Sequence, residues 1–465
     1  MALESRAEAS SAPTVPAWLV GAELASALIE EGYSSCQYIV YSSGRCRRKR
    51  KDVLGRYVTW FRKFVSVAGA ISMVLLACVA CGGPTSSSQS NAPLKIGISV
   101  SLSGDFSADG KTIEQGYQLW ADTINKKGGL LGRQVQLDIL SDASSAQQVV
   151  TNYQKLITID HVDLVFGPFS TLLTKPSSQI ANRYGYAMLE GAGGGPAVFD
   201  RGLHNVFDVS VPIANNLVSF ARYILSLPAS ERPKTAAYAT QDDPFTQPQV
   251  DLARQMLEQG GVQTVSYQVY PAETTDYTPI AAKVIGSGAQ VDVLGTFLPD
   301  ITAFLHAFKQ QHYNPQALIA TSGPDQGDQF IKAVGMGSTN GVLVPNGWYP
   351  QANNPGNADM VQSYLAKYGG TADSISANVA EAYSVGQVLE QAVNKIHSID
   401  NAALIRELHS GDTFTSVQGP VKFDNSGQNV AAQTYLFQWQ NGNLIPVYPA
   451  SAAKASPEYP KPQWS

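Results

Sequence analysis

Three residues, Phe169, Ser170 and Thr171, are the ones best suited by type and position to bind an anion. They follow the apolar sequence VDLVF, which predicts a buried strand, and they begin a predicted helix. The first amide groups of a helix have no intrahelical partner, so together with nearby hydroxyls they favour a negative charge. Ser170 or Thr171 can also simply cap the helix, and the two roles are compatible. The loop is therefore predicted to hold an anionic group of a ligand.

A glycine-rich segment, GAGGG at residues 191–195, follows the next predicted strand, Ala187–Leu189. Pro196 stands where a dinucleotide-binding fingerprint has its last glycine, so the segment does not predict a nucleotide site. Two interpretations remain. The segment is either a flexible structural turn or a place where backbone groups bind a ligand.

Recognisable catalytic and metal-binding motifs are missing from the sequence. There is no HExxH, no GxSxG and no phosphate loop ending in Gly-Lys-Ser/Thr. The six histidines are scattered and have no metal-ligand spacing. The four cysteines are Cys36, Cys46, Cys78 and Cys81, so the long remainder of the chain contains no thiolate nucleophile. The sequence thus predicts no catalytic residue, no metal site and no cofactor, and a protein that is not an enzyme.

An uncharged stretch, Phe64–Ala80, follows Arg62 and Lys63 and is slightly short for a membrane span of about 20 residues. A basic flank, a short apolar core and small residues at its end are typical of a signal peptide. The stretch ends at Cys81 and a Gly- and Ser-rich segment, which looks like a bacterial lipoprotein signal with a flexible tether. Cys81 is the predicted lipidated residue and Cys78 the alternative. An uncleaved transmembrane anchor is the other interpretation, and in both cases the remainder is extracytoplasmic and attached to the cell membrane.

Three N-terminal segments are therefore separated from the folded part. They are a poorly structured extension with a basic n-region at 1–63, the apolar signal at 64–81 and the tether at 82–92. The extension contains a basic run, residues 45–51, of a kind that binds nucleic acid or anionic lipid. An over-long n-region is the simpler explanation. The net charge of −5 and the pI of about 5.7 argue against a nucleic-acid-binding protein.

From Pro93 onward, short apolar strands alternate with amphipathic helices. In residues 112–127, for example, Ile113, Tyr117 and Trp120 recur at helical spacing. The predicted strands are 94–100, 135–139, 162–166, 187–189, 235–239, 265–269, 291–296, 317–321 and parts of 419–439; the predicted helices are 112–127, 146–157, 174–184, 217–225, 247–259, 277–285, 302–311, 359–368 and 376–397. Repeated strand–helix units predict an α/β fold with parallel sheets. There are too many of these units for a single sheet. Ligands of such sheets lie beyond the carboxyl ends of the strands.

Several motifs match one family in their order and spacing. They are Asn125–Arg133 (NKKGGLLGR), the opening IGISVSLSGDFSADG, Phe166–Thr171, Tyr270–Thr278 and Gly419–Asp424. Together they extend over nearly all of residues 93–447 and resemble type I periplasmic binding proteins. The closer resemblance is to the leucine/isoleucine/valine-binding branch, the solute-binding lipoproteins of ABC importers. It implies two Rossmann-like lobes that are joined by a three-segment hinge and close on a ligand.

The resemblance also implies a division of the chain and a set of pocket residues. Lobe one is expected at 93–211 and 343–419, lobe two at 212–342 and 420–449, and a C-terminal tail at 450–465. In the family, the loop of Phe169, Ser170 and Thr171 holds the ligand's α-carboxylate, with the hydroxyl at Thr171.

A second loop departs from the family pattern. The family places a carbonyl and a hydroxyl near Ala192, Gly193 and Gly194, where they meet the ligand's ammonium and carboxylate groups. Here Gly194 takes the place of the hydroxyl residue. This leaves binding to the backbone and is expected to make room for a larger or differently shaped ligand than an ordinary α-amino acid.

The remaining implied pocket residues lie in other loops. Phe245 and Phe297 match aromatic residues that cover the ligand, and a core position is the alternative for each. Asp325 aligns with the acid that pairs with the ligand's ammonium group, or it belongs to a turn. Asp109 replaces a frequent pocket aromatic, so it either favours a cationic group or caps a helix. Tyr383 is predicted to be a core residue.

The function that the resemblance implies is capture of an amino acid or a related carboxylate or amide, followed by delivery to an ABC permease. The chain is expected to be a monomer with a lipid anchor, and no nucleic acid is expected among its partners. One alternative is an extracytoplasmic sensing domain of a signalling system. A secreted α/β hydrolase is the other, and it lacks a recognisable nucleophile and base.

Overall fold

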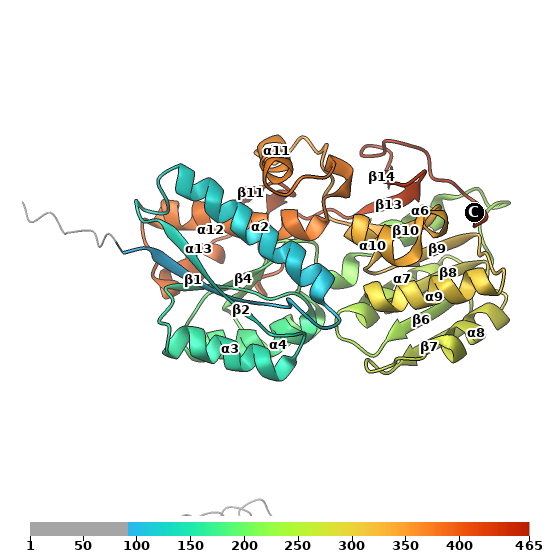
Figure 1. Cartoon of the computed structure of the whole chain (residues 1–465), viewed down its shortest axis with the longest axis horizontal. Coiled ribbons are helices and arrows are strands. Elements are labelled where there is room, and N and C mark those ends of the chain that lie inside the picture. Colours follow the sequence, from blue (N-terminus) through green and yellow to red (C-terminus); the bar gives the residue numbers. More distant parts are fainter. Residues whose placement is uncertain (1–91, 465) are drawn as a thin grey trace, which may run out of the picture. The chain divides into compact units, whose positions relative to one another are not determined.

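The computed structural model describes residues 92–464, which fold around two larger β-sheets and a short hairpin (Figure 1). The predicted N-terminal extension, the apolar signal, Cys78 and Cys81 lie outside the described residues, as does the tether apart from residue 92. Among the described residues, no helix has both the length and the apolar character needed to cross a membrane.

Lobe 1 is defined here by a wholly parallel five-stranded sheet with the order β2-β1-β3-β4-β5. Its strands are β1 (Leu94–Val100), β2 (Val135–Ser141), β3 (Leu164–Phe166), β4 (Met188–Glu190) and β5 (Val206–Asp208). Its helices are α2 (Ser107–Lys126), α3 (Ala146–Thr158), α4 (Thr171–Arg183), α5 (Pro196–Phe199), α11 (Asn357–Tyr368), α12 (Ala377–Ile396) and α13 (Asn401–Leu408), with the turn η4 (Ala372–Ser374) and the hairpin β11 (Phe414–Ser416) and β12 (Gly419–Val421). In Figure 1, α2 and α12 lie on one side of this sheet and α3 and α4 on the other.

Lobe 2 is defined by a seven-stranded sheet with the order β14-β13-β10-β9-β8-β6-β7. Its strands are β6 (Thr235–Gln241), β7 (Gln263–Tyr270), β8 (Val291–Gly295), β9 (Ala317–Ala320), β10 (Val342–Asn346), β13 (Tyr435–Gln440) and β14 (Asn443–Tyr448). Its helices are α6 (Val218–Ser226), α7 (Thr246–Gln259), α8 (Thr278–Gly286), α9 (Leu298–Gln310) and α10 (Asp328–Val334), with the turns η1 (Ile213–Asn215), η2 (Pro324–Gln326) and η3 (Met336–Ser338). β13 is antiparallel to both of its neighbours, whereas the strands from β10 to β7 are parallel.

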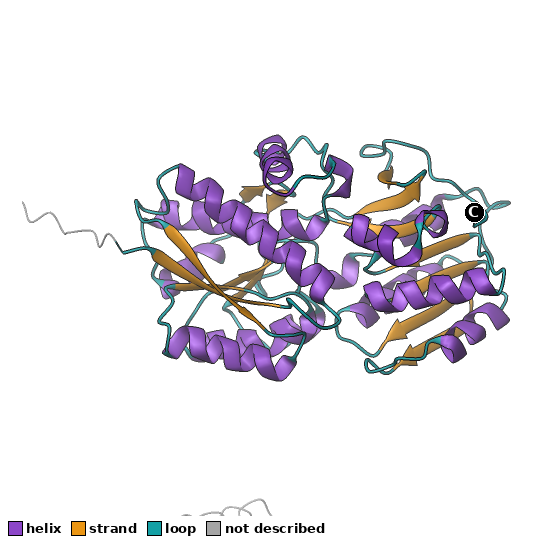
Figure 2. Cartoon of the chain, in the orientation of Figure 1, coloured by secondary structure: helices purple, strands orange, loops and turns teal. Residues whose placement is uncertain are grey.

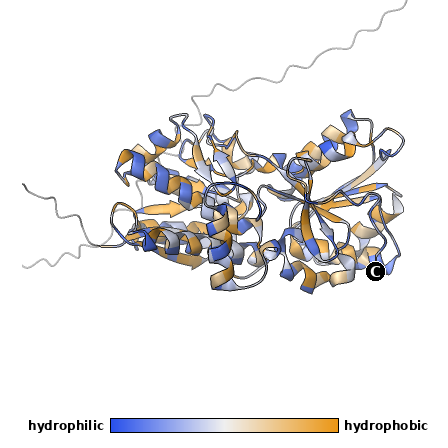
Figure 3. Ribbon diagram, turned by 90° about the horizontal axis from the view of Figure 1, so that it is seen from above, coloured by the Kyte–Doolittle hydropathy of each residue, from blue (hydrophilic) through white to orange (hydrophobic). Residues whose placement is uncertain are grey.

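Both faces of the lobe 2 sheet are buried, which follows from alternation along its strands. In β6, Ala237 and Ala239 pack with α8, α9 and α10, while Ala236 and Tyr238 pack with α6 and α7 on the opposite face. Figure 2 marks the strands and helices, and in Figure 3 the apolar colouring follows the strands while polar colouring lies mainly on the helices. The predicted α/β fold of two parallel-sheet lobes is confirmed.

Within residues 92–464, the chain passes between the two sheets after β5, after β10 and after β12. The expected boundary at residue 343 falls inside β10. That strand pairs with β9 and β13, so residues 343–346 belong to the lobe 2 sheet. The residues of the expected tail pack on lobe 2, because the Lys461 amide donates to the Gln316 carbonyl at 2.7 Å and the Trp464 indole donates to the Tyr313 carbonyl at 2.7 Å.

A close crossing of α2 and α12 positions the polar residues discussed below. A Cβ on Gly116 would lie 2.4 Å from the Val379 carbonyl oxygen, and one on Gly386 would lie 2.1 Å from the Trp120 ring. Only glycine allows this backbone approach. The crossing brings the first turn of α12 beside the first turn of α2, where Asn378 donates to Asp109 at 2.9 Å.

Candidate functional site

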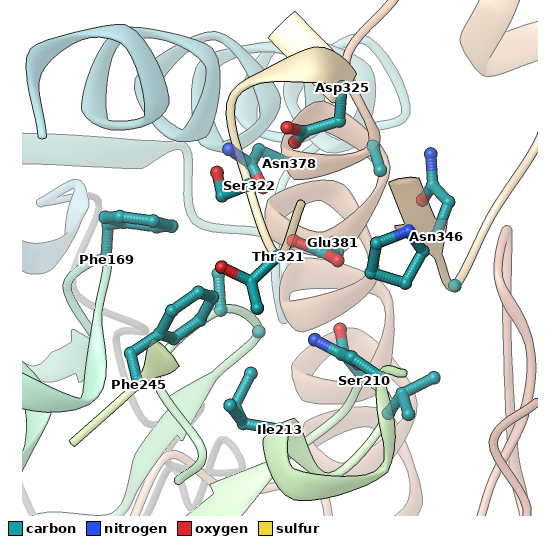
Figure 4. A pocket seen from close by; sticks show the side chains of 17 residues that line it. Phe169, Ser210, Ile213, Phe245, Thr321, Ser322, Asp325, Asn346, Asn378 and Glu381 are labelled. Atoms are coloured by element: carbon teal, nitrogen blue, oxygen red, sulfur yellow. The ribbon is translucent and has the colours of Figure 1, made fainter. Parts of the chain in front are cut away.

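A small cavity of about 40 Å³ lies between lobe 1 and lobe 2 (Figure 4). Loops that follow the carboxyl ends of strands line much of it, from β3 and β4 in lobe 1 and from β6, β9 and β10 in lobe 2. Its lining residues are Phe169, Gly191, Ala192, Ser210, Val211, Ile213, Asn216, Phe245, Thr321, Ser322, Asp325, Pro345, Asn346, Gly347, Ala377, Asn378 and Glu381. This is the edge at which ligands of parallel sheets are bound.

Four of the predicted ligand-binding residues line the cavity: Phe169, Ala192, Phe245 and Asp325. The other predicted residues, which are Asp109, Ser170, Thr171, Gly193, Gly194 and Phe297, lie behind this lining or beside it. Tyr383 is buried and does not line the cavity, in agreement with its predicted core position. Contact of any of these residues with a ligand stays a prediction.

Four phenylalanines from both lobes form an aromatic cluster at one side of the cavity. Phe106 and Phe169 come from lobe 1, and Phe245 and Phe297 from lobe 2. The ring centroids of Phe106 and Phe297 are 4.7 Å apart, and those of Phe169 and Phe245 are 5.6 Å apart. Phe297 is only 1% exposed. The predicted covering aromatics are therefore packed against each other, and the sequence did not identify Phe106 as their partner.

The hydroxyls predicted to bind an anion have partners within the protein. Ser170, at the left-handed φ of 70°, accepts from the Leu172 amide at 3.3 Å and caps α4. The Thr171 hydroxyl accepts from the Gly195 amide at 3.1 Å. Both residues are fully buried. Ser170 therefore caps the helix, which is one of the two roles expected for it. Anion binding by this loop stays a prediction.

Gly194 was expected to make room for a ligand, but the structure shows that other side chains require a glycine there. A Cβ at this position would lie 1.9 Å from the Asp208 carboxyl oxygen and 2.8 Å from Glu190 Oε1. The space beside Gly194 is thus filled by two carboxyl groups, and it gives no extra room to a ligand. Glu190 also accepts from the Ala192 and Gly193 amides at 2.9 and 2.6 Å, which holds the glycine-rich loop in place.

Glu190 and Asp208 are buried with one oxygen each unpartnered, Glu190 Oε1 and Asp208 Oδ2. Burial, and then the charge of Asp208, raises the pKa of Glu190 well above its usual range. Burial raises the pKa of Asp208 to about 7. Burial therefore favours the protonated, neutral form of both carboxyls.

Asp109 connects the two lobes through hydrogen bonds. Its Oδ1 accepts from Asn378 of α12 at 2.9 Å, from Ser322 at 3.3 Å and from Gln326 at 2.5 Å, the last two in lobe 2. Asp109 is 1% exposed and its Oδ2 has no partner. Burial, and then the charge of Asp325, raises the pKa of Asp109 to about 8. Its expected contact with a cation remains a prediction, since it lies one layer behind the lining.

Asp325 lies in η2 and faces the cavity. Its Oδ1 accepts from the Gly323 amide at 2.8 Å, and its Oδ2 accepts from Gln326 at 3.2 Å. Burial raises the pKa of Asp325 to about 6. Both oxygens therefore have protein donors, and one side chain, Gln326, bridges Asp325 and Asp109.

Glu381 of α12 is a lining residue that the sequence interpretation missed. It lies one turn after Ala377 and one turn before Val385, in the middle of the buried stripe of the helix. A charged residue inside an apolar helical stripe was the available signal. Burial, and then the charges of Asp325, Asp208 and Asp109, raises the pKa of Glu381 well above its usual range.

The cavity is acidic. Asp325 and Glu381 line it, and none of the described lining residues is a lysine, arginine or histidine. Asn216 and Asn346 add amide groups, and Ser210, Thr321 and Ser322 add hydroxyls. Within residues 92–464, no group of three or more histidine, cysteine, aspartate or glutamate side chains is arranged to hold a metal ion.

The sequence profile of the periplasmic binding protein family matches residues 93–443. The chain belongs to this family. A Leu/Ile/Val-binding protein homologue from Brucella suis is 26% identical over 395 residues, which cover 82% of this chain and 97% of that protein. The family is extracytoplasmic, and its proteins bind small molecules.

Solved structures share the fold. A leucine-binding protein from Thermotoga maritima gives a TM-score of 0.68 at 19% identity, covering 76% of this chain and 97% of that one. A solute-binding protein from R. palustris in complex with benzoate also gives 0.68, at 17% identity, covering 79% of this chain and 99% of that one. Since an amino acid and an aromatic acid appear in the names of equally similar structures, the fold does not identify the ligand.

Proposed function

We propose that this chain is the extracytoplasmic solute-binding protein of an ABC importer. It captures a small amino-acid-like molecule in the cavity between the lobes and delivers it to a permease without chemical change. The observation that carries this proposal is a cavity lined by both lobes at the carboxyl ends of their strands, in a chain of the periplasmic binding protein family. No observation favours the sensing-domain or hydrolase alternatives.

Capture follows from the way the lobes meet. Phe169 packs on Phe245, and Asp109 accepts from Ser322 and Gln326, so opening the lobes breaks apolar and polar contacts together. A ligand that touches both sides of the cavity adds contacts only in the closed state. It therefore shifts the population towards closure by its differential affinity for the two states.

Several further assignments belong to the same proposal. Phe169 and Phe245 supply apolar contact area, and Asp325 supplies a partner for a cationic group. The loop of Ser170 and Thr171 and the amides of the glycine-rich loop meet the opposite end of the ligand. The chain acts as a monomer, divided into lobes as predicted apart from β10, and is held at the membrane by a lipid on Cys81 or Cys78.

A thermal-shift experiment tests the proposal. Purified full-length protein is heated with separate amino acids, amines, short carboxylic acids and amides. One chemical class should raise the melting temperature, because a ligand that binds only the native state stabilises it. Absence of any shift across all four classes, together with no small molecule found by mass spectrometry of the purified protein, would contradict small-solute capture.

A further inference from the structure

Glu381 differs from the other acidic groups around the cavity in having no hydrogen-bond partner in the described part of the chain. Asp325 has two donors and Asp109 has three. No donor reaches the Glu381 carboxyl, although it lines the cavity, and Figure 4 shows it between Thr321 and Asn346. Glu381 is half-buried, so its carboxyl remains open to the cavity. A donor for this carboxyl therefore comes from the cavity, either as water or as a cationic group of a ligand.

Within residues 92–464, no positively charged group is found among those that interact electrostatically with Glu381. The groups that act on it or respond to it are Asp109 and Tyr117 on α2, Asp325 in η2, Glu190 at the end of β4 and Asp208 at the end of β5. All are acidic or neutral. Asn346 and Thr321 are near in the lining, and they carry no charge. The electrostatic potential in the cavity is thus negative whenever either lining carboxyl is ionised.

We propose that Glu381, together with Asp325, makes the cavity select a ligand with more positive than negative groups, such as a diamine or a basic amino acid, over a zwitterionic leucine. This inference rests on the proposed function and specifies the ligand class of the same site.

Charge balance supports this assignment. A zwitterionic amino acid brings one ammonium group, which pairs with one lining carboxylate and leaves the other unpaired. Its carboxylate, like that of a basic amino acid, meets only amides and hydroxyls as donors, so this group does not distinguish the two ligands. A ligand with two ammonium groups pairs with both Asp325 and Glu381. A basic amino acid does the same, and its single carboxylate requires only uncharged donors.

The apolar part of the cavity limits the size and shape of this ligand. Phe169, Phe245 and Ile213 face the same space as the two carboxyls. A short aliphatic chain between two basic groups meets both surfaces. A large polycation would leave most of its charge unpaired in the cavity.

Isothermal titration calorimetry with full-length protein at pH 7.5 tests the proposal, using 1,4-diaminobutane, L-lysine, L-leucine and butanamide as probes. At least one of the two basic probes should bind more tightly than leucine and butanamide. Glu381→Gln should weaken binding of the basic probe by at least about tenfold, since the probe loses one of its two charged partners in the cavity. The same variant should leave the affinity for leucine within about threefold. Glu390→Gln, the same change on the same helix but away from the lining, is the control and should change neither affinity.

The possible outcomes are distinct. Tighter binding of leucine or butanamide than of either basic probe overturns the charge selection while leaving solute capture intact. Equal affinities of wild type and Glu381→Gln for the basic probe overturn the role of Glu381. If Glu381→Gln does not fold, Glu381→Asp keeps the charge and should retain the preference for basic probes, and loss of that preference then counts against the proposal. No binding of any probe class here or in the thermal-shift panel removes the proposed function, and this inference with it.

Discussion

One side of the cavity is aromatic and the other is acidic, and both sides connect lobe 1 to lobe 2. On the aromatic side, four rings pack against each other across the two lobes: Phe106, Phe169, Phe245 and Phe297. On the acidic side, the buried Asp109 Oδ2 and the half-buried carboxyl of Glu381 have no donor in the described part of the chain. Apolar contacts stabilise closure without a ligand, whereas the Glu381 carboxyl is open to the cavity and available to a ligand. The first side therefore sets the closed geometry and the second sets selectivity.

The largest effect is expected on the aromatic side. Phe297→Ala should lower the free energy of unfolding by about 3–5 kcal/mol, because it leaves a hole beside the three remaining buried rings. Urea denaturation measures this. Ile159→Ala removes an aliphatic side chain that is 67% exposed and should change stability by less than about 0.5 kcal/mol. Similar losses in both variants would mean that the aromatic cluster does not hold the lobes together.

Gly194→Ala tests the packing of the acidic side. The new methyl group would meet Asp208 and Glu190 within van der Waals distance, so a loss of about 1–3 kcal/mol is expected. Gly286→Ala is a matched control, since a Cβ at this helical position meets nothing within 4 Å. Denaturation of both variants should show loss only at 194. An unchanged Gly194→Ala variant would contradict the close approach of the two carboxyls.

Because of its buried acids, the ligand-free protein is expected to be more stable at pH 5 than at pH 8. The pKa of Asp109 is raised to about 8 and that of Asp208 to about 7, so the folded state binds more protons than the unfolded state above pH 4. The free energy of unfolding should therefore fall as the pH rises from 5 to 8. Asp109→Asn should make this fall smaller by about 1–3 kcal/mol, since each unit of pKa shift corresponds to about 1.4 kcal/mol.

Denaturation at several pH values measures this dependence. Asp200→Asn, at an exposed position after α5, should retain the wild-type dependence on pH. A stability that rises between pH 5 and 8 in the wild type would contradict the proposed protonation of the acidic side.

The smallest effect concerns the loop of Ser170. Ser170→Ala removes the cap of α4 and should cost about 1 kcal/mol. Ser145→Ala removes the equivalent cap of α3 at a position that does not line the cavity, and it should cost a similar amount. If the loop binds the ligand, only Ser170→Ala should also weaken binding in calorimetry. Equal affinities of the two variants would limit Ser170 to capping.

Much of the fold followed from local patterns. The expected bounds of β1 agree with the structure, and α12 differs by one residue at each end. α2 begins at Ser107, earlier than expected at Thr112, because Gly110 packs against the Ser101 carbonyl, a contact from elsewhere in the fold. α9 begins at Leu298 because Pro299 is tolerated in a first helical turn.

Other elements were missed for reasons that lie in the tertiary structure. β10 contains Pro345, which argues against a strand in sequence reasoning, and its pairing with β9 and β13 comes from distant parts of the chain. α13 and β14 are short and depend on packing against neighbouring elements. The boundary between the lobes that the resemblance implied falls inside this strand.

The candidate site also contains residues that local patterns predicted and a residue that they did not. Phe169, Ala192, Phe245 and Asp325 follow strands, so the rule of the carboxyl ends places them near a ligand. Glu381 is on a helix, and it reaches the cavity only because Gly116 and Gly386 let α2 and α12 approach closely. That crossing has no local signature in the sequence.

Amide hydrogen exchange on the full-length protein, with and without the probe that gives the largest thermal shift, tests capture between the lobes most directly. Slower exchange is expected in both lobes at once, at the amides of residues 191–195 and 377–381 of lobe 1 and of residues 321–323, 325–326 and 346–347 of lobe 2. Slower exchange confined to one lobe, or at segments away from the cavity, would contradict it.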